Sequence, residues 1–236
     1  MPFITLILPV RNDNEELTRN FPKIYKYMSD SYGRTGFEII IAEGGSTDSS
    51  KVVAQKLSEL YEVTACINLS GGRGFALKQA IKIAKGWVIG YTDIDLPVPL
   101  GYISKAAAAI RDGSEVVIGS RYAEGSKTKR DIIRLILSSS YNYLIRLIFQ
   151  TGIYDHQCGF KFWKGSYIKR LAGKIKDDRW FFDTEMIIIA RKDKARIFSM
   201  PIEWNEREYT SSKVKLSDIF YFIKAIIREL RIAKES

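Results

Sequence analysis

The first 120 residues alternate short apolar runs with amphipathic helical patterns, and this alternation limits the fold more than any other feature. The apolar runs predict strands at residues 3–10, 37–42, 63–69, 88–92 and 115–120. The segments between them predict helices at residues 15–29, 47–60, 75–84 and 100–110. Because strand and helix follow each other in turn, the sequence predicts an α/β fold with a mostly parallel central sheet flanked by helices.

Polar clusters follow each expected strand, at the point where the strand would end. They read PVRNDNEE after the first strand, EGGSTD after the second, SGGRG after the third, DIDLP after the fourth and SRY after the fifth. Ligands of open α/β sheets bind beyond the carboxyl ends of the strands. We therefore expect these clusters to meet at one edge of the sheet and to form the functional site there.

The second half of the chain is less regular. Residues 124–134 indicate a basic loop that leads into a helix, and residues 132–149 are apolar and aromatic, interrupted by a few polar side chains. The segments DHQCGFKFW and DDRWFFDTE are expected to be polar-aromatic loops, and residues 196–204 are expected to be a late strand.

The C-terminal segment carries an apolar stripe at helical spacing, from Leu216 to Leu230. Lys224, Arg228 and Arg231 lie between the apolar positions, so we expect these cations on the opposite face of the helix. The chain is therefore expected to consist of one domain over residues 1–212 and an amphipathic helix over residues 213–236.

Charge and cysteine content narrow the class of protein. The 236 residues carry a formal net charge of +10, which favours an anionic partner such as nucleic acid, a membrane surface or a phosphorylated small molecule. The two cysteines do not make a disulfide framework, which favours a reducing compartment. The single histidine excludes a histidine-rich metal site.

No cleavable signal is recognisable, and we see no apolar run of the roughly 18 residues that a membrane-spanning helix needs. We expect a chain that is soluble or that lies on a membrane without crossing it. A peripheral position on the cytoplasmic face would agree with the cysteine content and the basic second half.

Two aspartates one residue apart, Asp93 and Asp95, follow the fourth expected strand. A polar turn at the end of a strand would explain them. The alternative is a divalent cation, Mg²⁺ or Mn²⁺, held by both carboxylates, because hard cations need oxygen ligands and two unpaired neighbouring charges are costly to bury. Both carboxylates reach one point only if the backbone bends, which Pro97 and Pro99 favour.

Other phosphate-binding chemistries fit the sequence less well. No G-x-x-x-x-G-K-[ST] loop is present, and GGRGFA lacks the spacing of a dinucleotide fingerprint because Leu77 replaces its last glycine. A phosphatase that uses a D-x-D-x-[TV] aspartate as nucleophile would need Thr or Val at Pro97. The remaining interpretation of Asp93 and Asp95 is a metal site that holds a diphosphate.

The chain resembles the family 2 glycosyltransferases of the GT-A fold, and among them the dolichyl-phosphate glucose and mannose synthases. Eight segments carry the resemblance, in order, from residue 4 to about residue 216: LILPVRNDNEEL, IAEGGSTDSS, GGRGFALKQAI, YTDIDLPVP, IGSRY, DHQCGFKFW, RWFFDTEMI and EWNEREYTSSKV. The fold that this resemblance implies is a Rossmann-like central sheet flanked by helices, with C-terminal amphipathic helices.

The resemblance also implies roles for individual residues. The residues expected at the base and ribose of a nucleotide are Pro9, Arg11, Asp13 and Glu43, with Arg73 near the nucleotide. Those expected at the metal and at the phosphates are Asp93, Asp95, Arg121 and Arg134. Those expected around the sugar are Asp155, Gln157, Asp183 and Glu185, with Ser212 and Lys213 in a loop that closes over it. Plainer interpretations exist for four of these residues. Arg121 and Arg134 could be solvated surface charges, and Asp183 and Glu185 could be acidic residues that complement the dipole at a helix N-terminus.

The activity that the resemblance implies is inverting transfer of a hexose from UDP-glucose or GDP-mannose to a polyprenyl or dolichyl phosphate at an anionic membrane surface. Arg134 and its neighbours in the basic, amphipathic second half would meet the acceptor phosphate. A soluble glycosyltransferase with a sugar or protein acceptor is the main alternative. A basic nucleic-acid-binding module is a distant one, because the cations are spread along the chain and no nucleic-acid-binding pattern is present.

Overall fold

The computed structural model describes the backbone of residues 1–68, 71–129, 131–205 and 216–235. Its main sheet has seven strands in the order β3-β2-β1-β4-β7-β5-β8. These strands are β1 (Ile4–Val10), β2 (Phe37–Gly44), β3 (Thr64–Asn68), β4 (Val88–Tyr91), β5 (Val116–Ser120), β7 (Lys161–Lys164) and β8 (Ile197–Pro201). A second, two-stranded sheet pairs β6 (Lys127–Lys129) with β9 (Glu203–Asn205). The expected α/β class and the five expected strands are confirmed.

Eight helices are present in the described residues. They are α1 (Asn14–Gly36), α2 (Ser50–Tyr61), α3 (Arg73–Ile83), α4 (Gly101–Arg111), α5 (Ile132–Phe149), α6 (Gly165–Ala172), α7 (Phe182–Lys192) and α8 (Leu216–Glu235). Helix α1 is longer than expected, because the chain continues in helical form after Ser29 and is kinked only at Gly33, whose φ is 66°. The expected boundary between residues 212 and 213 lies outside the described residues.

The segment DHQCGFKFW is not only a loop, as expected, but also contains a strand. β7 lies between β4 and β5 and runs antiparallel to both, whereas the other pairs of the sheet are parallel. Its side chains alternate, so Phe162 packs in the core on one face of the sheet and Trp163 in the core on the other. The two large apolar side chains therefore suit a central strand that is covered on both faces.

Two further expectations need correction. The segment DDRWFFDTE was expected to be a loop, yet its second half begins α7 at Phe182, where the apolar residues of MIII continue the helix. The late strand expected over residues 196–204 is two strands, β8 in the main sheet and β9 in the small one. Ile202 separates them and is buried in the core.

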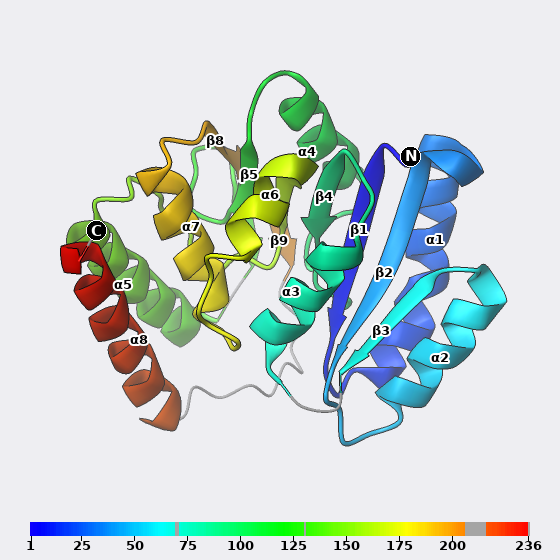
Figure 1. Ribbon diagram of the computed structural model, residues 1–236, viewed down its shortest axis with the longest axis horizontal. Coiled ribbons are helices and arrows are strands. Elements are labelled where there is room, and N and C mark those ends of the chain that lie inside the picture. Colours follow the sequence, from blue (N-terminus) through cyan, green and yellow to red (C-terminus); the bar gives the residue numbers. More distant parts are fainter. Residues whose placement is uncertain (69–70, 130, 206–215, 236) are drawn as a thin grey trace.

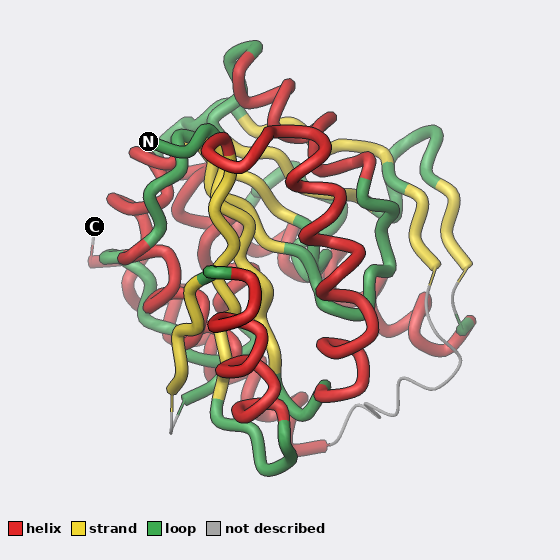
Figure 2. The backbone as a smooth tube through the Cα atoms, turned by 90° about the vertical axis from the view of Figure 1, so that its right-hand side faces the viewer, coloured by secondary structure: helices red, strands yellow, loops and turns green. Residues whose placement is uncertain are grey.

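Helices cover both faces of the sheet, and Figures 1 and 2 show this arrangement from two sides. The apolar residues of α1, α2 and α4 form one core with the strands. Those of α3, α6 and α7 form the other. The opposite side of α7 packs on α5 and α8, through Phe181 and Ile188 against Ile145, Ala225 and Ile226. Helix α7 thus lies between the sheet and an outer layer made of α5 and α8.

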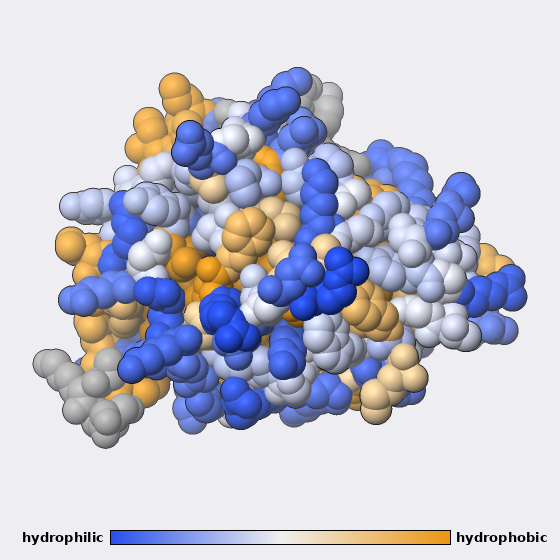
Figure 3. Space-filling view, turned by 90° about the horizontal axis from the view of Figure 1, so that it is seen from above, coloured by the Kyte–Doolittle hydropathy of each residue, from blue (hydrophilic) through white to orange (hydrophobic). Residues whose placement is uncertain are grey.

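Helices α5 and α8 expose apolar side chains. In α5 the exposed ones include Ile132, Ile133, Ile136, Tyr143 and Leu147, and in α8 they include Ile219, Phe220, Ile223 and Ile227. In Figure 3 apolar surface gathers on the left, the side where both helices lie in Figure 1. By length and composition, α5 could cross a membrane, with a mean hydropathy of 1.3 and only 11% of its residues buried. This differs from the expectation that no segment would meet that criterion.

Gly90 in the middle of β4 is required by the antiparallel neighbour. A Cβ at this position would lie 2.1 Å from Cδ1 of the Phe162 ring, so close that the buried ring or the strand would have to shift. We expect Gly90→Ala to lower the free energy of unfolding by about 1–3 kcal/mol, the usual cost of overpacking a core.

Thermal denaturation followed by circular dichroism measures this loss. Gly101→Ala is the matched control, because a Cβ at Gly101 meets nothing within 4 Å and alanine favours a helix more than glycine does. Its melting temperature should stay the same or rise. Equal melting temperatures for the two variants would contradict the packing argument.

Candidate active site

The two aspartates lie on a tight turn directly after β4. The backbone N–H of Leu96 donates to the carbonyl of Asp93 at 3.1 Å, and Leu96 has a φ of 53°, so the chain reverses within four residues. The Asn20 side chain of α1 donates to the Ile94 carbonyl at 3.0 Å and holds the turn against the domain. The expected bend is therefore present. Asn20 was not singled out in the sequence, since a polar residue in an amphipathic helix carries no distinct signal.

The Asp93 carboxylate lies in a space that only a glycine leaves open. A Cβ at Gly159, in the loop before β7, would lie 1.8 Å from Oδ2 of Asp93. The other oxygen, Oδ1, forms an ion pair with Nη2 of Arg73 at 2.7 Å and accepts no regular hydrogen bond from the described residues. A buried carboxylate oxygen in this position is suited to a cation.

Arg73 connects Asp93 with a second buried carboxylate, Asp183, from the first turn of α7. Nε of Arg73 lies 3.5 Å from Oδ2 of Asp183. Oδ1 of Asp183 accepts hydrogen bonds from the Tyr91 hydroxyl and from Nζ of Lys161, both at 2.5 Å. The charges of Lys161, Asp183, Arg73 and Asp93 alternate in sign, and we call these four residues the Asp93 cluster.

Asp183 is ionised in this arrangement. Burial by itself would raise the pKa of its carboxyl, but Lys161 and Arg73 hold that pKa below the ordinary value. Burial and the neighbouring Asp183 charge raise the pKa of Tyr91 well above its usual range. Lys161 has no exposed surface and was missed in the sequence. A signal existed, because a lysine between Phe160 and Phe162 is a charge inside an apolar strand.

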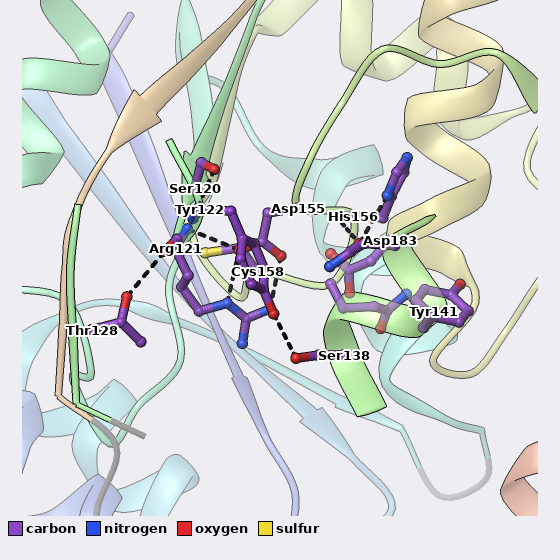
Figure 4. Close-up of polar contacts among 12 residues, drawn as sticks. Ser120, Arg121, Tyr122, Thr128, Ser138, Tyr141, Asp155, His156, Cys158 and Asp183 are labelled. Carbon is purple, nitrogen blue, oxygen red and sulfur yellow. Dashed lines mark hydrogen bonds and ion pairs between the residues drawn. The ribbon is translucent and has the colours of Figure 1, made fainter. Parts of the chain in front are cut away.

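Arg121 and Asp155 form a second buried ion pair at the end of β5 (Figure 4). Nε and Nη2 of Arg121 each donate to one Asp155 oxygen at 2.7 Å, and the Arg121 backbone N–H donates to Oδ2 at 3.0 Å. The guanidinium also lies 4.8 Å from the Trp204 ring centroid. Burial raises the pKa of Asp155, but Arg121 outweighs it and holds the pKa below the ordinary value. Arg121 is therefore not a solvated surface charge.

Side chains of α5 form hydrogen bonds with residues next to Asp183, Arg121 and Asp155. The Tyr141 hydroxyl lies 2.6 Å from Oγ1 of Thr184, the neighbour of Asp183, and the Tyr122 hydroxyl lies 2.5 Å from Oγ of Ser138. Oδ1 of Asn142 accepts from the backbone N–H of His156, next to Asp155, and lies 2.9 Å from its Nδ1. In Figure 4 a dashed line joins Tyr122 and Ser138, and Tyr141 and His156 lie beside Asp183.

His156 stays neutral at this position. Both ring nitrogens have a partner, Asn142 at Nδ1 and Thr151 at Nε2, each at 2.9 Å. Burial lowers the pKa of His156 to about 3, so its charge does not change near neutral pH. The residue organises its loop and links it to α5.

The residues expected at a nucleotide base lie at the ends of β1 and β2. Val10 and Glu43 are paired in the parallel register, and the buried Glu43 accepts a hydrogen bond from the Ser46 backbone at 2.5 Å. The two loops that follow are joined, because the Asn12 side chain accepts from the Thr47 backbone at 2.8 Å.

Three of the expected base-pocket residues differ in exposure. Pro9 is buried in β1, Arg11 is exposed and Asp13 is half-buried. Burial raises the pKa of Asp13, and the charge of Asp93 acts in the same direction. Asp13 follows β1 and the aspartate turn follows β4, so both lie at the same edge of the sheet, because these two strands are parallel neighbours.

The remaining expected residues are more scattered. Nε2 of Gln157 donates to Thr184 at 2.7 Å and to the Trp180 carbonyl at 3.2 Å. Glu185 does not line the Asp93 cluster: it accepts from the backbone of residues 176 and 177 and pairs with Arg228 of α8. Arg134 lies in the first turn of α5, where Asp131 caps its backbone N–H at 3.2 Å. Ser212 and Lys213 lie outside the described residues.

Known proteins resemble this chain over most of its length. Residues 5–172 match the family "Glycosyl transferase family 2". "Dolichyl-phosphate beta-glucosyltransferase ALG5D" of Trichomonas vaginalis is 30% identical over 243 residues, which cover 98% of this chain and 73% of that protein. "Glycosyltransferase AglD" of Haloferax volcanii is 27% identical over 207 residues, 86% of this chain, and the match spans only 33% of AglD.

Solved structures share the fold at low sequence identity. A crystal structure of glucosyl-3-phosphoglycerate synthase from Mycobacterium tuberculosis, in complex with Mn²⁺, uridine diphosphate and glucosyl-3-phosphoglycerate, superimposes with a TM-score of 0.66. The identity is 12%, and the superposition covers 97% of this chain and 78% of that one. The family match over residues 5–172, together with the Trichomonas vaginalis relative at 30% identity, shows that the chain belongs to glycosyl transferase family 2.

Proposed function

We propose that this chain transfers a hexose from a nucleotide sugar to a polyprenyl phosphate, such as dolichyl phosphate, at the surface of a membrane. One observation carries the proposal. The Asp93 cluster is suited to a cation and a diphosphate, and Thr184, the neighbour of Asp183 in that cluster, is hydrogen-bonded to Tyr141 of α5. Helix α5 exposes apolar side chains. The Trichomonas vaginalis relative is named as a dolichyl-phosphate beta-glucosyltransferase, which supports this acceptor and favours glucose as the sugar. UDP-glucose is thus the first donor to test, with GDP-mannose second.

The proposal includes a divalent cation, Mg²⁺ or Mn²⁺, held by Asp93 and Asp95. The Asp93 carboxylate, which packs against Gly159 and pairs with Arg73, and the second aspartate of the same turn supply oxygen donors of the kind that such an ion takes. Within the described residues no group of three or more His, Cys, Asp or Glu side chains could hold a metal. Magnesium-type sites of this kind take one or two carboxylates and complete the shell with water and substrate phosphates. When bound, the cation would neutralise charge on the departing nucleoside diphosphate.

The chain's own residues would place the two substrates and compensate their charge. The acceptor phosphate is already ionised near neutral pH, so its attack on the sugar carbon needs no strong general base. This agrees with Asp183, whose carboxylate already accepts hydrogen bonds from Lys161 and Tyr91 and orients Arg73. A single displacement inverts the anomeric carbon and gives a β-linked product from an α-linked donor.

The exposed faces of α5 and α8 would rest in the headgroup region of the membrane, on the cytoplasmic side. Lys224 and Arg231 are exposed on α8 and would meet anionic lipid at roughly 1 kcal/mol each. Arg228 was expected to join them, but it pairs with Glu185 and Asp177 and so points into the protein. The apolar side chains would supply the larger part of the binding.

Asp95→Ala tests the metal clamp. We expect transfer to fall by more than about a hundredfold, because a lost carboxylate ligand removes roughly 3 kcal/mol or more of leaving-group stabilisation. The melting temperature should not change. EDTA should abolish activity and added Mn²⁺ should restore it. Asp30→Ala, at an exposed carboxylate of α1, is the control and should keep full activity. Normal turnover of Asp95→Ala, or in EDTA, would refute the clamp.

Arg134 and Arg121 should respond differently to substitution. Arg134→Ala should lose activity by orders of magnitude with little change in melting temperature, and Arg134→Lys should recover only part, since ammonium cannot make two parallel hydrogen bonds. Arg121→Ala should also lower stability, by about 3–5 kcal/mol, because Asp155 would remain buried without its partner. Transfer assays and thermal denaturation separate the two effects. Full activity of Arg134→Ala would return Arg134 to the surface-charge interpretation.

Liposome flotation tests the membrane contact. The wild-type chain should float with anionic liposomes, and added salt should weaken the binding. Replacing Phe220, Ile223 and Ile227 by serine should abolish flotation and leave the fold intact, because these side chains are 44–64% exposed. Ile136→Ser and Leu147→Ser in α5 should also weaken flotation with the liposomes. If the wild-type chain stays at the bottom of the gradient, a soluble sugar or protein acceptor becomes the better proposal.

A further inference from the structure

The segment of residues 176–181, here called the strap, joins the C-terminal helix to the Asp93 cluster. It runs from the end of the α6 region to the start of α7, and its backbone and side chains contact α8 on one side and α3 on the other. Neither set of contacts belongs to the roles that the sequence resemblance implies. The strap is one physical route between α8 of the outer helix layer and Arg73.

Helix α8 holds the strap through two side chains. The Tyr221 hydroxyl donates to Oδ1 of Asp177 and accepts from the Phe181 backbone N–H at 3.1 Å. The Arg228 guanidinium bridges Oε2 of Glu185 at 2.8 Å and Oδ2 of Asp177 at 3.5 Å. Asp177 and Glu185 are 3% and 1% exposed, so neither carboxylate can replace a lost partner by water.

The same two carboxylates shape the strap. Oδ1 of Asp177 accepts from the backbone of Arg179 at 2.8 Å and of Phe182 at 3.2 Å. Glu185 accepts from the backbone of Lys176 at 2.6 Å and of Asp177 at 2.8 Å. The conformation of the strap therefore depends on groups that α8 neutralises.

The far side of the strap caps the N-terminus of α3. The Arg179 carbonyl accepts from the Gly74 N–H at 3.1 Å, and the Asp178 carbonyl accepts from the Phe75 N–H at 3.0 Å. These donors lie in the first turn of α3, where no intrahelical acceptor exists. A Cβ at Gly72 would lie 2.5 Å from the Asp178 carbonyl, which shows how closely the two backbones approach.

Arg73 lies within this capped turn and contacts the strap directly. Its guanidinium carbon is 5.7 Å from the centroid of the Trp180 ring, and its Nη2 is 2.7 Å from Asp93. A shift of the strap would therefore move Arg73 relative to the aspartate turn. From these contacts we infer that Tyr221 and Arg228 are positioning residues, which hold Arg73 at the donor diphosphate site through the strap. This inference rests on the proposed function for its ligand.

Tyr221→Phe and Arg228→Met test the inference, singly and together. Binding of UDP and GDP, each with Mn²⁺, is measured by calorimetry without lipid and well below the melting temperature. We expect the double variant to bind the preferred nucleotide about tenfold more weakly, as for coupled residues in a contact network. The KM for the nucleotide sugar should rise and the KM for a short polyprenyl phosphate should not. Arg228→Lys should recover part of the affinity.

Ile227→Ser is the matched control, because Ile227 neighbours Arg228 in sequence but is 44% exposed. It should keep the nucleotide affinity of the wild type. The Tyr221 and Arg228 variants should still float with anionic liposomes, since their side chains are bonded to the strap. The two faces of α8 would then affect two separate properties, membrane binding and donor binding.

Hydrogen exchange tests the strap without any ligand. The amides of Gly74 and Phe75 should exchange faster in Tyr221→Phe than in the wild type, and those of β2 should be unchanged. Unchanged exchange at Gly74 and Phe75, or unchanged nucleotide affinity with only a lower melting temperature, would overturn the inference. If the wild type binds neither nucleotide with Mn²⁺, the proposed function fails, and the exchange result still decides whether α8 holds the strap.

Discussion

The alternating charges of Lys161, Asp183, Arg73 and Asp93 are the interaction on which the site depends. Lys161 and Asp183 are buried, Arg73 is 13% exposed and Asp93 is partly exposed, and each buried charge is tolerated because its neighbour has the opposite sign. The series begins on β7, passes through α7 and α3, and ends on the turn after β4. Three separate elements must therefore dock correctly before Asp93 occupies its place.

Helix α7 makes this arrangement sensitive to the outer layer of the molecule. Its inner side packs on the sheet with α3 and α6, and its outer side packs on α5 and α8. Asp183, Thr184 and Glu185 lie in successive positions of its first turn, so they face different partners. Asp183 belongs to the charge series, Thr184 bonds to Tyr141 of α5, and Glu185 pairs with Arg228 of α8.

Glycines are required wherever two backbones or a backbone and a carboxylate approach closely. Gly159 leaves room for Asp93, and Gly72 and Gly74 leave room for the strap. The GGRG sequence is rich in glycine at the start of a helix but lacks the spacing of a phosphate-binding loop, and the backbone N–H groups of Gly74 and Phe75 already donate to strap carbonyls. The steric need of the strap explains these two glycines without an anion at the helix N-terminus.

The sequence by itself determined the α/β class, the five parallel strands and the polar edge, because hydrophobic periodicity is a local property of the chain. It also indicated the aspartate turn, since two carboxylates between an apolar strand and two prolines are typical of a polar turn or of a cation site. Tertiary structure alone decided which partners the charges have. Arg121 pairs with Asp155, Glu185 turns to Arg228, and Lys161 and Asn20 join the site. These pairings join residues that are 22 to 74 positions apart in sequence. Burial makes them obligatory, and burial exists only once the sheet and its helices have packed.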